Sequence, residues 1–256
     1  MPLSNTKAKR YKLILEYIFR KYYQPGIVQF NFLREDIVEA CEMLGFERIK
    51  NLGDFIYNSR YRSLFPEFIT DTAPPDRMWV IRPAARAQYS FVLWRKLDLS
   101  PRTGLNITTI PEATPGIVEM YASSDEQGLL AKLRYNRLID IFSGTTCYSL
   151  QSHLRTTILD NVQVETDELY VGIDQAGLQY VFPVQAKGRR ERLGVVQIWQ
   201  DAVLCRESFP ALVCRPIGAR FLASDLIALM EFNVDADGVS IVNERHYKLV
   251  PKEPGS

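Results

Sequence analysis

Hydrophobic positions in the first quarter of the chain recur at helical spacing. Apolar side chains stand three or four residues apart in three segments, residues 5–23, 33–44 and 51–63. Pro25-Gly26 and Gly45 follow the first two segments, and a proline or glycine in that place commonly ends a helix. A weak alternation over residues 27–32 is typical of a short strand. The pattern predicts three helices, with one short strand between the first two.

A second pattern, of strand-like alternation, begins after the turn-forming residues 72–76. Met78 and Val80 alternate with Trp79 and Ile81, and residues 89, 91 and 93 share one face, which predicts a β-hairpin whose connection, Arg82 to Gln88, is basic. Three helices followed by a basic-tipped hairpin is the layout of a winged helix-turn-helix, whose third helix enters the major groove of DNA. We therefore expect DNA contacts from five polar or basic side chains: Asn58, Arg60, Arg62, Arg82 and Arg86. The alternative is a small α+β packing domain whose surface arginines are simply solvated.

The second half of the chain mixes both periodicities. Prolines and glycines between residues 98 and 115 indicate a linker. A capping-box pattern, Ser123 with Glu126, then begins a helix that Gly144 ends. Strand patterns and one further helix follow, at residues 147–156, 162–173, 179–187, 193–209 (the helix), 212–221, 226–234 and 239–249. We expect three parts: a DNA-binding domain at 1–100, a linker at 101–115 and a second domain at 116–256.

Composition excludes several classes of protein. The 256 residues are 46% hydrophobic and 24% charged, as in ordinary globular domains, and no apolar run reaches the ~20 residues that cross a bilayer. The four cysteines form no CxxC pair and there are two histidines, which argues against a zinc site and a serine-histidine triad. Glycine-rich phosphate loops of the P-loop and dinucleotide types are also absent from the sequence.

The net charge of +1 conceals an asymmetry between the two halves. Residues 1–100 hold 16 Lys and Arg against 11 Asp and Glu, a net of +5, whereas residues 101–256 have a net of −4. A basic half followed by an acidic half suggests a module that binds a polyanion, joined to one that gathers carboxylates.

The segments 162–173 and 179–187 are the most informative about chemistry. If they form a hairpin around residues 175–177, Gly177 takes the left-handed position of the loop, and the numbers of paired residues sum to 352. Side chains alternate along a strand, so that four polar residues then share one face of the sheet in two facing pairs: Asp167 with Gln185, and Glu165 with Lys187.

Such a cluster has the composition of a magnesium site. Carboxylate and amide oxygens are hard ligands suited to Mg²⁺, and a nearby lysine can orient or deprotonate an attacking water and offset phosphate charge. We expect Asp167 and Gln185 to hold Mg²⁺, helped by Glu165, with Lys187 acting on the water. The alternative is a cross-strand Glu165–Lys187 ion pair on a solvated face.

The order helix, three strands, helix, strand, with Asp167 followed by Gln185-Ala186-Lys187, resembles the PD-(D/E)xK nuclease superfamily, which includes most type II restriction endonucleases. The resemblance covers residues 115–225 and implies an α+β or α/β fold with an αβββαβ core on a mixed sheet. It implies a Mg²⁺-dependent DNA endonuclease in which Asp167, Gln185 and Lys187 are catalytic. Arg189 and Arg190, directly after the lysine, would hold backbone phosphates. Polar residues on the flanking helices are weaker candidates: Glu126, Asp140, Gln197 and Gln200.

Two departures from the family pattern matter. No proline precedes Asp167, and the acidic position of the motif is Gln185, a neutral and weaker ligand. The first hypothesis is a type II restriction enzyme acting as a homodimer on double-stranded DNA in a bacterial cytoplasm, because cutting both strands needs two active sites. The alternatives are a DNA-binding regulator with a degenerate, inactive nuclease-like domain and, with less support, a repair or recombination nuclease.

Overall fold

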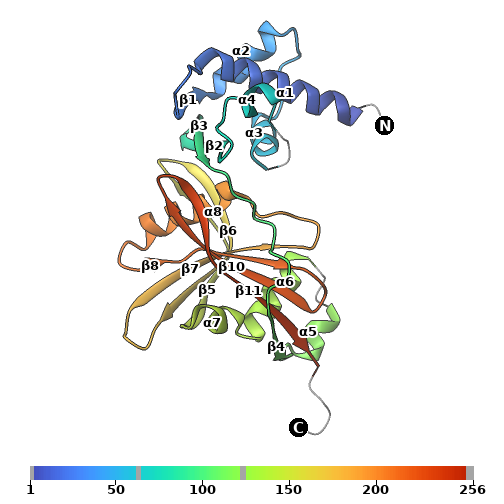
Figure 1. The fold of residues 1–256 in the computed structure, drawn as a ribbon, viewed down its shortest axis with the longest axis vertical. Coiled ribbons are helices and arrows are strands. Elements are labelled where there is room, and N and C mark those ends of the chain that lie inside the picture. Colours follow the sequence, from blue (N-terminus) through green and yellow to red (C-terminus); the bar gives the residue numbers. More distant parts are fainter. Residues whose placement is uncertain (1–2, 62–64, 122–124, 252–256) are drawn as a thin grey trace. The chain divides into compact units, whose positions relative to one another are not determined.

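The computed structural model of the protein describes residues 3–61, 65–121 and 125–251 (Figure 1). The chain divides into two compact units. The first unit is residues 1–96 with 159–162, and the second unit is residues 97–158 with 163–256. Both units contain helices and strands, and the second contains a mixed sheet, so that the protein belongs to the α+β class.

The first unit places helices against a three-stranded antiparallel sheet. Its elements are α1 (Leu3–Tyr22), β1 (Gln29–Leu33), α2 (Arg34–Met43), α3 (Leu52–Tyr61), α4 (Glu67–Thr70), β2 (Arg77–Ala85) and β3 (Gln88–Arg95). The strand order is β1-β3-β2. The core is aromatic: the ring of Phe19 lies 5.2–5.3 Å from the rings of Phe30, Trp79 and Phe91. The predicted helices and short strand are therefore present, and α4 is an addition.

The tip of the β2–β3 hairpin differs from the sequence prediction. Arg82 lies inside β2, opposite Ser90, and the turn is formed by Arg86 and Ala87, the latter with a left-handed φ of 59°. Pro83 does not end the strand because β2 is at the edge of the sheet, where a residue without an N–H is tolerated. The expectation that Arg82 is part of the hairpin connection was wrong; it is half-buried, and burial lowers the pKa of its guanidinium.

The second unit is built on one large mixed sheet. Its elements are β4 (Ile107–Pro111), α5 (Gly116–Tyr121), α6 (Glu126–Tyr135), α7 (Leu138–Ser143), β5 (Thr146–Ile158), β6 (Val162–Ile173), β7 (Gln179–Lys187), α8 (Val195–Ser208), β8 (Val213–Cys214), β9 (Ile217–Phe221), β10 (Leu226–Asp235) and β11 (Gly238–Val250). The strand order is β4-β11-β10-β9-β7-β6-β5, and β8 pairs with β7. Strand β7 runs antiparallel to β6 and parallel to β9.

Two sequence predictions about the start of this unit were wrong. Residues 101–115 are not a free linker, because β4 pairs in parallel with β11, with Ile107 beside His246. The single helix expected after residue 123 is two helices, since Arg137 adopts a left-handed conformation (φ 49°) between α6 and α7. The expected N-cap, Ser123, lies outside the described residues; the carboxylate of Asp125 caps α6 by accepting from the backbone amides of residues 127 and 128.

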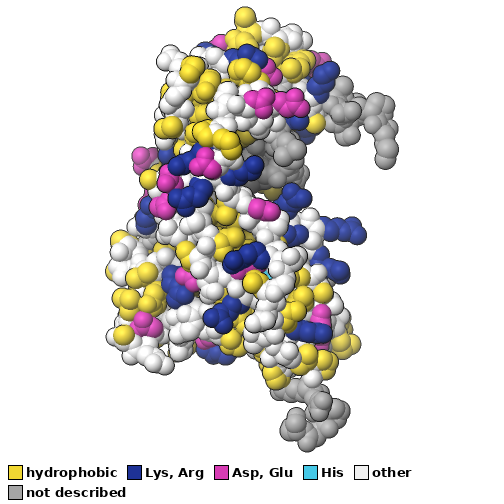
Figure 2. All heavy atoms as spheres, viewed as in Figure 1, with side chains coloured by type: hydrophobic (Ala, Val, Ile, Leu, Met, Phe, Trp, Pro, Cys, Tyr) yellow, Lys and Arg dark blue, Asp and Glu magenta, His cyan; other side chains and the backbone are white. Residues whose placement is uncertain are grey.

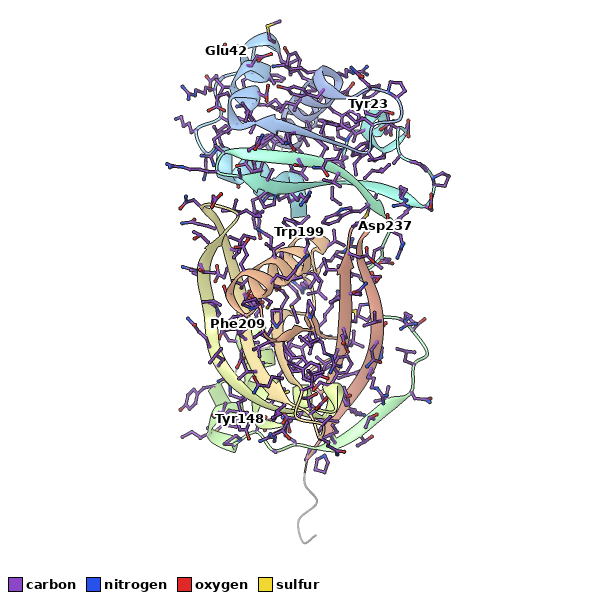
Figure 3. All side chains as sticks on the ribbon, turned by 90° about the vertical axis from the view of Figure 1, so that its left-hand side faces the viewer. Tyr23, Glu42, Tyr148, Trp199, Phe209 and Asp237 are labelled. Atoms are coloured by element: carbon purple, nitrogen blue, oxygen red, sulfur yellow. The ribbon has the colours of Figure 1, made fainter. Side chains whose placement is uncertain are left out.

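The helices cover opposite faces of the sheet. Even-numbered residues of β7, such as Phe182 and Val184, belong to a core with α6 and α7, whereas Val181 packs with Leu169 and with Cys205 of α8. Neighbouring residues of a strand point to opposite faces, which sets α6 and α7 on one side and α8 on the other. Figure 3 shows α8 between the β5–β6 and β10–β11 hairpins of the curved sheet.

Among the described residues, no helix is long and apolar enough to span a membrane.

Candidate active site

The β6–β7 hairpin has the register that the sequence predicted. Glu168 pairs with Val184 and Ile173 with Gln179, so that paired numbers sum to 352. Gly177 closes the turn with a left-handed φ of 83°, and its amide donates to the carbonyl of Asp174 at 3.1 Å. This part of the prediction is confirmed.

The regular ladder ends at the Glu168–Val184 pair, and Asp167 begins a different arrangement. The backbone amide of Ala186 donates to Oδ2 of Asp167 at 2.8 Å, so that a side-chain carboxylate accepts the next amide of β7. Lys187 Nζ lies 3.6 Å from the same Oδ2 and also donates to Oε1 of Glu126, the first residue of α6. Asp167 is 8% exposed and Lys187 is 9% exposed. Three elements thus bring two carboxylates and one ammonium group together, with Asp167 and Lys187 buried and Glu126 partly exposed.

Burial sets the electrostatics of this cluster. It raises the pKa of Asp167 above its usual range, although Lys187 and the amide of Ala186 act to lower it. Burial likewise raises the pKa of Glu126, against the effect of its ion pair with Lys187. For Lys187, burial lowers the pKa but the Asp167 and Glu126 carboxylates raise it by more, and the net shift is upward. The ammonium group is therefore charged at neutral pH, while both carboxylates are in a setting that favours additional positive charge.

Gln185 is next to this cluster and contacts a residue that sequence reasoning missed. It is 1% exposed, and its Nε2 donates to the carbonyl of Glu165 at 3.1 Å and to Oδ1 of Asp201 at 3.3 Å. Asp201 belongs to α8, is also 1% exposed, and accepts a 2.6 Å hydrogen bond from the hydroxyl of Thr166. Burial raises the pKa of Asp201 to about 7.

The signal for Asp201 was present in the sequence. It is the one acidic residue in an otherwise apolar and amide-bearing stretch, residues 195–205, of a helix that is buried along most of its length. An ionisable side chain that the fold buries so deeply is a candidate for function. The prediction instead considered Gln197 and Gln200 on this helix, because the family resemblance drew attention to glutamines.

The carboxylate of Glu165 does not join the cluster. It contacts Nε of Arg155 at 3.1 Å and Nδ1 of His153 at 3.8 Å, both on β5, and only its carbonyl reaches Gln185. The expectation that alternation brings four side chains together was therefore wrong for Glu165, and the expected Asp167–Gln185 and Glu165–Lys187 pairs are not part of the ladder. Alternation fails because the ladder ends at Glu168, beyond which Thr166 turns toward α8. Glu126, from a different element, brings the second carboxylate to Lys187.

The residues expected to contact DNA are in diverse surroundings. Asn58 donates to the carbonyl and to Oδ1 of Asp54 on its own helix, and the guanidinium of Arg60 lies 5.2 Å from the ring of Tyr89. Arg62 lies outside the described residues. The exposed residues of the set are three: Arg86, Arg189 and Arg190. On the face of the first unit that Figure 2 shows, Lys and Arg side chains are interspersed with Asp and Glu and form no single block.

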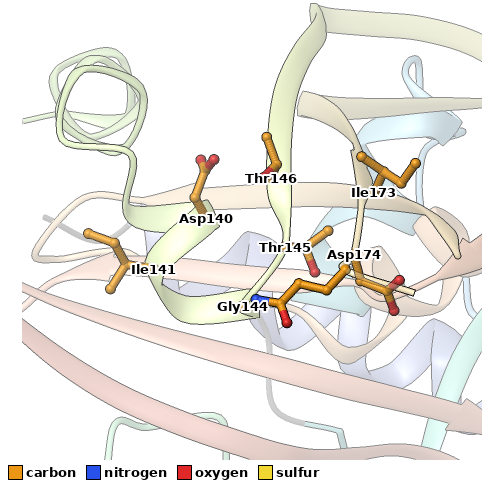
Figure 4. A pocket seen from close by; sticks show the side chains of 8 residues that line it. Asp140, Ile141, Gly144, Thr145, Thr146, Ile173 and Asp174 are labelled. Carbon is orange, nitrogen blue, oxygen red and sulfur yellow. The ribbon is translucent and has the colours of Figure 1, made fainter. Parts of the chain in front are cut away.

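A separate hollow of about 400 Å³ lies where α7 meets β5 and the end of β6 (Figure 4). Its two carboxylates are already engaged: Asp140 accepts from the amide of Cys147, and Asp174 accepts from Tyr180 and from two turn amides. Of the predicted site residues, those that line it include only the weaker candidate Asp140. The carboxylates in this hollow therefore serve the local turns, and we assign no ligand to it.

Comparison of the chain with protein-family models, with curated proteins and with solved structures gives no match. The inference of function accordingly depends on the residues and their geometry.

Proposed function

We propose that the protein is a Mg²⁺-dependent DNA endonuclease of the PD-(D/E)xK type, acting as a restriction enzyme at a specific duplex sequence. The observation that carries the proposal is the buried contact of Lys187 with Asp167 and Glu126, beside Gln185. The element order α6/α7, β5, β6, β7, α8 and then β9, with the two-residue strand β8 between the last two, supports the αβββαβ core that the resemblance implies.

The residues at the site fit a magnesium ion. Asp167 has a raised pKa because burial leaves its carboxylate short of compensating charge. Both hydrogen bonds of the Gln185 side chain use Nε2, so that among the described residues its Oε1 keeps a free lone pair for a hard cation. Asp167 and Gln185 would hold the ion, which when bound lowers the pKa of a coordinated water and neutralises charge on the scissile phosphate.

Lys187 acts as a charged donor in this proposal. Because its pKa is raised, it does not serve as a general base at neutral pH. It would orient the attacking water and stabilise negative charge that develops on the phosphate oxygens. Glu126 fixes its position by accepting a hydrogen bond from Nζ.

A plasmid-cleavage assay tests this function, with Lys187→Ala as the inactive variant. Lys132→Ala is a matched control, since Lys132 also makes an ion pair of low exposure, with Glu112 of the same unit. We expect Mg²⁺-dependent cleavage by the wild type and by Lys132→Ala, and loss of cleavage with DNA binding retained in Lys187→Ala. Equal cleavage by wild type and Lys187→Ala would remove the proposed site.

We also propose that the first unit binds DNA as a winged helix. Its strand order β1-β3-β2, with α1, α2 and α3 ahead of the β2–β3 hairpin, supports this interpretation. A fragment of residues 1–100 should bind duplex DNA without cutting it. Binding should weaken steeply with salt, because contacts to phosphates release counterions. A folded fragment without DNA affinity at low salt would contradict the winged-helix interpretation.

Gln185 favours a second candidate function, a DNA-binding regulator whose nuclease-like unit is inactive. A neutral amide replaces an anionic ligand there, which weakens a metal site. A Gln185→Glu protein that cleaves no DNA with Mg²⁺ or with Mn²⁺ would support the regulator function. Under the endonuclease proposal we expect a homodimer, because a double-strand cut needs two active sites, and light scattering with and without DNA measures this.

A further inference from the structure

The carboxylate of Asp201 is unusual among the buried carboxylates of the second unit. The other buried carboxylates described in this unit each have a Lys or Arg within ion-pair distance: Asp167, Glu168 and Glu244. Asp201 instead contacts the neutral groups of Thr166 and Gln185 through Oδ1. Its Oδ2 is buried and, among the described residues, accepts no hydrogen bond.

Such an atom needs an explanation, since a buried carboxylate without a cation or a full set of donors is strongly unfavourable. The neighbours of Asp201 indicate which partner would resolve it. Gln185, one hydrogen bond away, directly precedes Ala186, whose amide holds the carboxylate of Asp167. Asp201 is thus linked through Gln185 to the segment that holds Asp167, and the three side chains carry hard oxygen donors of the kind that a divalent cation takes.

We propose that Asp201 supplies the second carboxylate of the metal site, and that it and Gln185 together replace the single acidic residue of the motif. The amide stays on strand β7, and the negative charge comes from helix α8. This inference rests on the proposed function for the identity of the cation, Mg²⁺ or its substitute Mn²⁺. It also explains how a chain with glutamine at the acidic position keeps a charged metal site.

The direct test measures Mn²⁺ binding by calorimetry, without DNA, in the full chain and in Asp201→Asn. The variant keeps the size of the side chain and removes its charge, so that the dissociation constant for Mn²⁺ should rise at least about tenfold. The melting temperature without metal should not fall, because an unpaired buried charge is lost. Asp225→Asn changes a half-buried aspartate 3.8 Å from Lys248; it is the control and should bind Mn²⁺ as the wild type does.

A charge exchange provides the second test. In Gln185→Glu/Asp201→Asn the carboxylate moves to the strand and the amide to the helix, and one amide–carboxylate hydrogen bond between them is kept in reversed direction. We expect the double variant to recover Mn²⁺ affinity to within about threefold of the wild type, since the site regains its charge. A double variant as weak as Asp201→Asn overturns the proposal.

These outcomes separate the inference from the proposed function. If Asp201→Asn lowers the metal-free melting temperature and binds Mn²⁺ like the wild type, Asp201 is only structural and the inference is wrong, whatever the cleavage assay gives. If Mn²⁺ binding depends on Asp201 and the wild type cuts no DNA, the metal site stands and the endonuclease proposal fails.

Discussion

Removal of the positive charge at Lys187 should destabilise the fold in a strongly pH-dependent way. Lys187→Met keeps most of the aliphatic side chain and deletes the ammonium group between Asp167 and Glu126. Leaving a buried carboxylate without its partner costs about 3–5 kcal/mol. The side chain of Glu126 is 32% exposed and its charge is partly screened by solvent. We therefore expect the free energy of unfolding to fall by about 3 kcal/mol at pH 8.

The sign of the pH dependence follows from the direction of each shift. The folded-state pKa of Lys187 is raised, so its contribution is complete below its unfolded pKa, and the wild type keeps it at both pH 5 and pH 8. Burial already raises the pKa of Asp167 and Glu126, and both rise further without the lysine. At pH 5 these carboxylates are protonated in the variant, which removes their unpaired charge. The loss of unfolding free energy relative to the wild type should then shrink to about 1 kcal/mol.

Urea unfolding in EDTA at pH 5 and pH 8 measures this difference. Lys132→Met is the control, because its partner Glu112 has a pKa of about 2, held down despite burial by Lys132, Thr114 and Asn136. Thr114 and Asn136 still donate to Glu112 in the control. Its loss of unfolding free energy should therefore be similar at both pH values. An equal loss for Lys187→Met at pH 5 and pH 8 would refute the assigned electrostatics of the site.

Three further predictions concern other parts of the molecule. Gly172→Ala should lower the free energy of unfolding by about 1–3 kcal/mol in urea titrations, because a Cβ there would lie 2.9–3.0 Å from the side chain of residue 145 and from residues 146 and 147. Arg86→Ala should weaken binding to all duplex sequences and reduce the salt slope by about 1, whereas Arg82→Ala should instead cost about 1 kcal/mol of stability. Gln185→Glu should lower metal-free stability by about 1–3 kcal/mol, since it places a carboxylate beside Asp201, and should increase the rise in melting temperature on adding Mg²⁺.

The sequence alone determined the local features of the second unit. The period of two along β6 and β7 and the glycine at position 177 were enough to predict both strands and their register. They also placed Asp167 and Lys187 at the same end of the hairpin, because pairing in a hairpin depends on residues near one another in the chain. The helices of the first unit were predictable for the same reason.

Only the tertiary structure decided which other groups lie at the candidate site. Glu126 contacts Lys187 and Asp201 contacts Gln185, from helices on either side of the sheet. They are 41 residues before Asp167 and 34 after it, and no period in the sequence encodes such a meeting. The end of the ladder at Glu168, which turns Glu165 away and Thr166 toward α8, depends on packing and on the carboxylate of Asp167 accepting a backbone amide. Strand β4 likewise became part of the sheet through pairing with β11, a partner more than 130 residues away. Local periodicity specifies which face of a helix or strand each side chain occupies. The distance between side chains that are remote in sequence is set by how the elements pack.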